Sequence, residues 1–185
     1  MAILANIVNE VKDGIVATIR GTNEITAEAT KLVRDTVVNS LRASGDIATT
    51  TVQVATDVAQ GVILGASTTG VSLVSAARSG VKAIVQGVSD VGGDVVEATA
   101  NAVKGTIRQT ADVGGDVAQV AVGAVQGAID ATTEVGGDVG GTTKKAVLAA
   151  VEAAESISTE TAEAVKNSLK AAISGAKEVL EAPFK

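Results

Sequence analysis

An eleven-residue repeat runs through this sequence without insertion or deletion. From Ile3, sixteen consecutive units end at Glu178, and residues 179–185 follow them. Unit positions 1, 2, 5, 6 and 9 contain none of the 15 Lys and Arg residues and none of the 21 Asp and Glu residues. Charges placed without regard to the repeat would not leave five positions of eleven empty, so the fold has to be derived from this unit.

The period of eleven predicts α-helix. Eleven residues complete three turns at about 3.67 residues per turn, which is close to the ordinary helical value. The charge-free positions then fall on one arc of about 130°, and the charged positions fill the remainder. A strand would need an alternation of period two, which is absent over most of the chain. We therefore expect an all-α fold of long amphipathic helices, either extended or folded into a hairpin bundle.

We expect residues 1–185 to form a single repeat region. Its most apolar part is 58–88, and residues 91–141 contain three acidic Gly-Gly-Asp segments. Position 6 of the unit lies at the centre of the apolar arc. Its aliphatic side chains are the expected apolar contacts: Val8, Ile19, Leu41, Val52, Ile63, Val74, Val85, Val96, Ile107, Ile129, Val151 and Ile173.

The charged face is sorted into two flanks. Helices packed side by side and parallel would bring the basic flank of one against the acidic flank of the next, whereas antiparallel neighbours would bring like charges together. The alternative is an ordinary solvated face whose sorting has no packing role. Position 10 forms the basic flank: Lys12, Arg34, Arg78, Lys144, Lys166 and Lys177. Position 4 forms the acidic flank: Glu28, Asp94, Asp116, Asp138 and Glu160.

Glycine pairs begin at Gly92, Gly114 and Gly136, two units apart. Each pair is either a turn between helices of about 20 residues or part of a continuous helix. In a continuous helix these glycines lie in the apolar arc and allow close packing of another backbone, as small-xxx-small patterns do. The same four-residue spacing occurs at Gly61–Gly65 and Gly123–Gly127. Because the repeat keeps its phase across every pair, we favour the continuous helix.

The composition predicts that such a helix is weak by itself. An interior Gly costs about 1 kcal/mol relative to Ala, and β-branched residues cost a few tenths. The chain has 20 Gly, one Phe and no Trp or Tyr, so it also lacks the aromatic residues that usually anchor a core. Its helicity should therefore depend on lipid, on another copy or on a segment that folds back.

The uncharged stretch Val58–Ala77 has the length of a membrane span. We favour the alternative, a more deeply seated part of the same surface helix, because the stretch contains Gln60 and keeps the repeat phase.

Enzyme chemistry is not expected. The chain has no His and no Cys, which excludes disulfides, the usual zinc sites and the commonest general base. On a continuous helix the carboxylates of Asp94, Asp116 and Asp138 would lie about 33 Å apart, too far to share a metal. We expect no cofactor and no metal site.

The net charge of −6, without a basic cluster, argues against a nucleic-acid partner. The first fifteen residues have neither the basic region nor the long apolar region of a secretory signal. The expected location is cytoplasmic, or peripheral to a membrane, lipid droplet or granule.

The segments GAVQGAIDATTEVGGDVGGTTKKAV and GVILGASTTGVSLVSAA resemble, in their pattern, the eleven-residue-repeat proteins of lipid surfaces, namely synucleins, perilipins and apolipoproteins. The resemblance implies a helix that folds on lipid and has no active site. The first hypothesis is therefore a protein that coats a lipid, membrane or storage-granule surface by side-by-side helix assembly. The alternative is a lipid-independent, self-assembling structural protein that forms a bundle, tube or filament. Both predict a homo-oligomer.

Overall fold

The computed structural model describes residues 6–19 and 25–182. This part of the chain is all-helical and contains no strand, which confirms the all-α prediction. Its nine helices are α1 (Ile7–Thr18), α2 (Ala27–Ser44), α3 (Ile47–Thr69), α4 (Leu73–Asp90), α5 (Val95–Asp112), α6 (Val117–Glu134), α7 (Val139–Glu155), α8 (Thr159–Ala172) and α9 (Ala176–Glu181).

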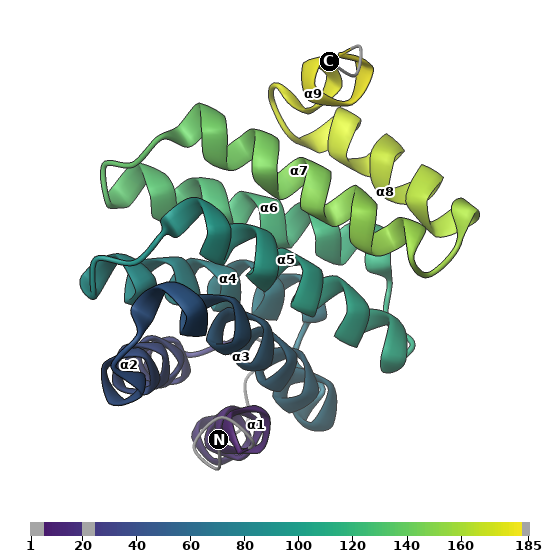
Figure 1. Ribbon diagram of the computed structural model, residues 1–185. Coiled ribbons are helices and arrows are strands. Elements are labelled where there is room, and N and C mark those ends of the chain that lie inside the picture. Colours follow the sequence, from purple (N-terminus) through teal and green to yellow (C-terminus); the bar gives the residue numbers. More distant parts are fainter. Residues whose placement is uncertain (1–5, 20–24, 183–185) are drawn as a thin grey trace.

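The helices form two layers, one of odd-numbered and one of even-numbered helices (Figure 1). Each helix folds back on the one before it and lies beside the helix two further along the chain. The register of the glycine contacts makes these same-layer neighbours parallel, because Gly123 lies against Val74 and Gly127 against Arg78. In Figure 1, α1 and α2 are seen nearly end-on while α7 and α8 run across the view, so successive pairs rotate as they stack.

The structural period in the centre of the chain is 22 residues, twice that of the sequence repeat. Helices α4, α5, α6 and α7 begin at Leu73, Val95, Val117 and Val139. Helices α4, α5 and α6 have 18 residues each, and a four-residue Val-Gly-Gly-Asp segment follows each of them. Two units of eleven therefore make one helix and one turn.

The glycine pairs end the helices, so the expectation of one continuous helix is wrong. The first glycine of each pair has a φ of 72–73°, in the left-handed region that glycine adopts without a steric cost. The second donates its N–H to a carbonyl five residues earlier, as in Gly93 to Val88 at 2.9 Å. This is the hydrogen bond of a Schellman turn, which satisfies a carbonyl left over at a helix end.

The aspartate after each glycine pair begins the next helix. The Asp94 carboxylate accepts a hydrogen bond at 3.0 Å from the N–H of Glu97, and Asp116 and Asp138 cap α6 and α7 in the same way. An N-cap of this kind satisfies one of the four N–H groups that a helix start leaves unpaired. The repeat keeps its phase across each turn because the turn is part of the 22-residue unit.

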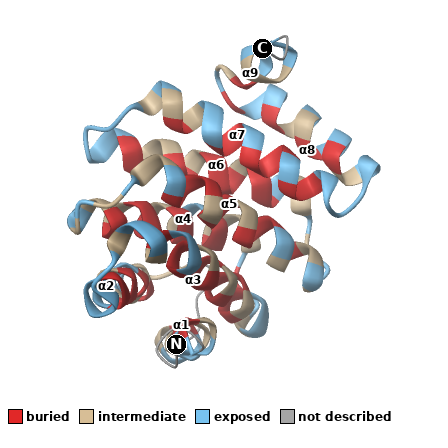
Figure 2. Ribbon diagram, in the orientation of Figure 1, coloured by how far each residue is buried: buried red, intermediate tan, exposed pale blue. Residues whose placement is uncertain are grey.

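The uncharged stretch 58–77 is divided between two helices. Helix α3 ends at Thr69, Gly70 has a φ of 74°, and α4 begins at Leu73. The expectation that this stretch is part of one surface helix is therefore wrong, because the chain turns at Gly70. In the described ranges, no helix combines the length and the apolar character that crossing a bilayer requires. Residues such as Ile63 and Ala66 are buried between the layers, where the core lies (Figure 2).

Candidate functional site

The apolar positions expected as a contact surface are largely inside the stack. Seven of the twelve are buried and all belong to even-numbered units: Ile19, Leu41, Ile63, Val85, Ile107, Val151 and Ile173. Four are half-buried, namely Val8, Val74, Val96 and Ile129, and Val52 is exposed at 36%. The chain therefore covers most of the expected contact surface with its own helices.

The close-packing role expected of Gly92, Gly114 and Gly136 is wrong. A Cβ at any of them would meet no atom within 4 Å, because all three lie in turns at the edges of the stack. The pairs Gly61–Gly65 and Gly123–Gly127 instead lie between parallel helices. Small residues at that spacing let two backbones touch.

Main-chain oxygens of the neighbouring helix take part in these contacts. A Cβ on Gly61 would stand 2.7 Å from the Val8 carbonyl oxygen, and one on Gly127 would overlap the Arg78 carbonyl oxygen. Gly105 in α5 makes an equivalent contact, in which its Cβ would stand 2.8 Å from the Thr56 carbonyl oxygen of α3.

The sequence contained a signal for this arrangement in position 4 of the repeat. In even-numbered units this position is nearly always small: Ala17, Asn39, Gly61, Ala83, Gly105, Gly127, Ala149 and Ala171. In odd-numbered units it holds residues that commonly cap or begin helices: Asn6, Glu28, Thr50, Ser72, Asp94, Asp116, Asp138 and Glu160. Treating all units as equivalent concealed the alternation.

The acidic flank belongs to helix starts. Asp94, Asp116 and Asp138 are N-caps, and Glu28 and Glu160 lie in the first turns of α2 and α8. A negative charge at these places interacts favourably with the unpaired N–H groups and with the helix dipole. These acids are therefore not the partners of the basic flank.

The basic flank pairs with other acids. Arg34 of α2 binds Asp90 of the parallel helix α4 through two hydrogen bonds of 2.6 and 2.8 Å, which raise the pKa of the guanidinium. Arg78 of α4 binds Asp130 of α6 at 2.7 Å. Such exposed pairs contribute about 0–1 kcal/mol each and mainly favour one alignment of the helices.

The other basic-flank residues have weaker or no partners in the described part of the chain. Lys166 lies 3.2 Å from Glu155, and Lys12 lies 3.9 Å from Asp13 of its own helix. Lys144 and Lys177 form no ion pair there.

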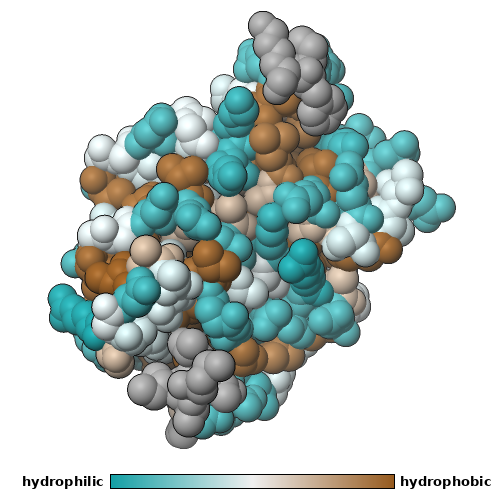
Figure 3. All heavy atoms as spheres, in the orientation of Figure 1, coloured by the Kyte–Doolittle hydropathy of each residue, from teal (hydrophilic) through white to brown (hydrophobic). Residues whose placement is uncertain are grey.

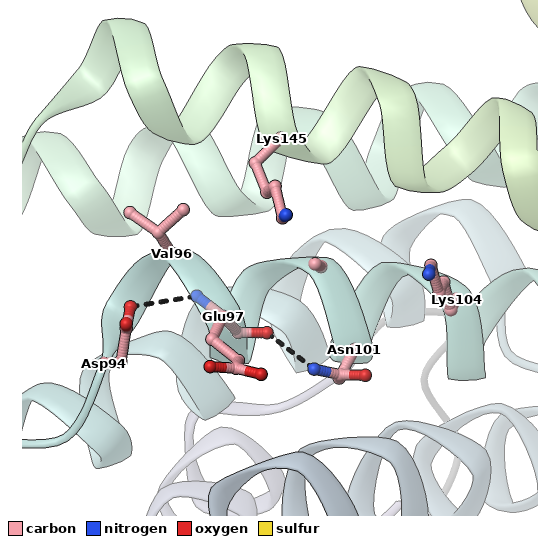
Figure 4. A pocket seen from close by; sticks show the side chains of 7 residues that line it. Asp94, Val96, Glu97, Asn101, Lys104 and Lys145 are labelled. Atoms are coloured by element: carbon pink, nitrogen blue, oxygen red, sulfur yellow. Dashed lines mark hydrogen bonds between the residues drawn. The ribbon is translucent and has the colours of Figure 1, made fainter. Parts of the chain in front are cut away.

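A groove of about 320 Å³ lies between α5 and α7 (Figure 4). Lys145 extends from α7 toward α5, whose Asn101 amide donates to the Glu97 carbonyl at 2.9 Å. Lys104 closes one side through a 3.0 Å ion pair with Glu152 of α7. The lining residues are Asp94, Val96, Glu97, Ala100, Asn101, Lys104 and Lys145. The groove thus presents acidic, basic and amide side chains.

Metal binding finds no support at this groove or elsewhere in the part of the chain described. No three residues of the types His, Cys, Asp and Glu come together there in a group that could hold an ion. Asp94 and Asp138 lie in turns at one edge of the stack and Asp116 in a turn at the opposite edge (Figure 1).

Asp57 is a carboxyl group that sequence reasoning did not single out. It is buried in α3 with 9% exposure, and the Gln53 amide lies 2.9 Å from both of its oxygens. Burial raises the pKa of Asp57 from its ordinary value, and the hydrogen bond from Gln53 opposes the shift. Position 11 ends a helix in even-numbered units such as those of Asp90, Asp112 and Glu134, whereas Asp57 belongs to an odd-numbered unit and lies inside α3.

Apolar residues on the visible face of the molecule form small patches separated by hydrophilic ones (Figure 3). The large apolar residues that are exposed come from separate helices and turns: Val16, Val52, Val135, Leu148 and Ile157. They do not build the extended apolar surface that marks many binding sites.

Comparison with models of protein families and with curated protein sequences finds no match. Among solved structures, the chain is similar to the crystal structure of the de novo designed helical repeat protein DHR7. The fold is that of a helical repeat protein. The two chains are 17% identical, the alignment covers 97% of this chain and 94% of the designed one, and the TM-score is 0.53. At this identity the similarity concerns the fold alone.

Proposed function

We propose that this chain is a non-enzymatic structural protein whose helical repeat stack folds without lipid. The observation that carries the proposal is the burial of the apolar repeat positions against the chain's own helices. A lipid surface would have to replace contacts such as that of Gly127 with the Arg78 main chain. A coat built from the apolar arc therefore requires the stack to open first.

The eleven-residue repeat has a packing role in this proposal. Each helix needs one apolar side toward the opposite layer and small residues toward its parallel neighbours. The period close to three helical turns keeps both sides in place along the helix. The protein then acts through its shape and polar surface, which includes the groove between α5 and α7 with its acidic, basic and amide side chains.

Far-UV circular dichroism in buffer, and then with neutral and anionic vesicles, tests the proposal. We expect a helical spectrum and a cooperative thermal transition in buffer, both unchanged by vesicles. A chain that is disordered in buffer and becomes helical with vesicles would contradict the proposal and support the lipid coat. Vesicle co-sedimentation of a Val52→Ser, Leu148→Ser variant is the control for binding through exposed apolar side chains. The variant replaces two exposed aliphatic side chains that do not belong to the buried core.

A further inference from the structure

The stack has three seams, each between one pair of helices and the next, and they are not built alike. At the first seam, Gly61 and Gly65 of α3 lie against α1, and Gly87 of α4 lies against α2. At the second seam, Gly105 of α5 lies against α3, and Gly123 and Gly127 of α6 lie against α4. At both seams, glycines lie against carbonyl oxygens and aliphatic side chains of the neighbouring helix, which brings the two backbones close together.

The third seam joins α5 and α6 to α7 and α8, and none of the described glycines closes it. In α7, Gly140 and Gly141 are near only the Asp138 side chain that caps their own helix. The place that Gly105 and Gly127 occupy in their units is taken by Ala149. The groove of about 320 Å³ lies along the outer side of this seam.

Two buried hydroxyl groups of α5 and α7 have no hydrogen-bond partner in the described part of the chain. They belong to Thr99 and Thr142, which are both 0% exposed. Thr110 and Thr132 are equally buried, but their hydroxyls donate to carbonyls of their own helices at 2.7 and 2.8 Å. A buried polar group without a partner lowers stability, because it loses its hydrogen bonds to water and gains none.

We propose that the third seam is a built-in opening, at which α7, α8 and α9 separate as one unit from α1–α6. The proposal rests on three observations: no glycine contact closes this seam, a groove lies between α5 and α7, and each of these two helices contains a buried hydroxyl without a partner. The helices on the two sides of this seam contain fully buried apolar residues, such as Val103 of α5 and Val147 of α7. The inference goes beyond the proposed function, since it states where the folded stack yields and which apolar surface it then presents.

Fraying of the end of any repeat array is the explanation against which the proposal must be tested. The α1–α2 pair, at the other end of the described stack, provides the comparison. It comprises only two helices, and α1 has 12 residues where α7 has 17. Simple fraying therefore predicts faster opening at α1–α2, whereas the glycine contacts predict faster opening at α7–α9.

Native-state hydrogen exchange of the full chain, measured by mass spectrometry at low denaturant concentrations, distinguishes the proposed opening from simple fraying. We expect amides of α7 and α8 to exchange together, at least tenfold faster than those of α2 and of α3–α6. Protection of α7 and α8 that equals or exceeds that of α2 would overturn the proposal. A helical spectrum in buffer would leave the proposed function standing in that case.

A Thr99→Val, Thr142→Val variant tests the cause, because valine keeps the shape of threonine and removes the hydroxyl. We expect exchange in α7 and α8 to slow at least fivefold, with no change in α2. Thr110→Val is the matched control, since it removes a buried hydroxyl that is hydrogen-bonded. Equal slowing in every helix, or slowing by the control alone, would count against the role of these hydroxyls.

Discussion

Gly127→Ala is the substitution that most directly tests how the layers are held together. Gly127 lies in the middle of α6, where alanine would ordinarily favour the helix by about 1 kcal/mol. Here the added Cβ would overlap the Arg78 carbonyl oxygen of α4. The obstacle is main chain, which cannot turn aside as a side chain can, so the two helices have to move apart.

Forcing extra volume into a packed site costs about 1–3 kcal/mol, and a main-chain obstacle favours the upper end. After the gain in helix propensity, we expect the free energy of unfolding to fall by about 2 kcal/mol. For a protein of this size that corresponds to a lowering of the thermal midpoint by about 4–8 °C. Urea unfolding followed by far-UV circular dichroism measures the change.

Gly140→Ala is the matched control in the same assay. Gly140 also lies in a helix, but a Cβ there would meet only an Asp138 oxygen at 3.6 Å, which is ordinary contact. Its stability should stay equal or rise. If Gly127→Ala were as stable as the unmodified chain, close contact of the α4 and α6 backbones could not be what holds the even layer together.

Four further outcomes are expected. Gly114→Ala should lower the free energy of unfolding by about 1–2 kcal/mol, because it forces alanine to a φ of 73°, and urea unfolding would show no loss if the turn were not required. Asp116→Ala should lower the free energy of unfolding by about 1 kcal/mol, because it removes the N-cap of α6. Asp116→Asn should keep most of that free energy, since asparagine also caps helices. An equal loss in the two variants, measured by urea unfolding, would exclude capping as the cause. Asp57→Asn should raise the thermal midpoint at neutral pH, because the folded state raises the pKa of the Asp57 carboxyl above its ordinary value of 3.8. The stability of the unmodified chain therefore falls as the pH rises from 3.8 through the raised pKa. In acid the carboxyl is protonated in both states, so the advantage of the variant in thermal unfolding should vanish there. Deleting residues 95–138 removes one helix from each layer and should leave a protein that unfolds cooperatively. Deleting residues 95–116 should abolish cooperative unfolding, because it places α6 in the layer opposite to the one it fits. Equal cooperativity of the two deletion variants in thermal unfolding would refute the two-layer arrangement.

The helical fold could be predicted from the repeat because helix geometry acts at every residue. Positions without charge recur at nearly three turns, and burial in the structure follows them at Ile63, Val85 and Ile107. The prediction of a continuous helix through the glycine pairs is wrong because it treats all units of the repeat as equivalent. An average over all units hides a difference between odd and even ones, and at position 4 that difference separates Asp116 from Gly127.

The charged flanks were predicted as faces, but their roles depend on where each helix ends. Asp94 caps a helix only because Gly92 has ended the preceding one. Arg34 reaches Asp90 because α2 and α4 lie side by side, and their separation of 56 residues leaves no mark in a local pattern. Asp57 stands at a position of the repeat that carries charge in other units, so the repeat does not mark it as buried.

The parallel contacts between same-layer helices have a consequence for how the chain is made. Arg78 leaves the ribosome about fifty residues before Gly127, the residue against which its carbonyl packs. At a synthesis rate of about 5–20 residues per second, this side of α4 stays without its partner for roughly 3–10 s. Each new helix thus completes a contact surface left by the helix two before it, and the nascent protein always carries an unfinished edge in each layer.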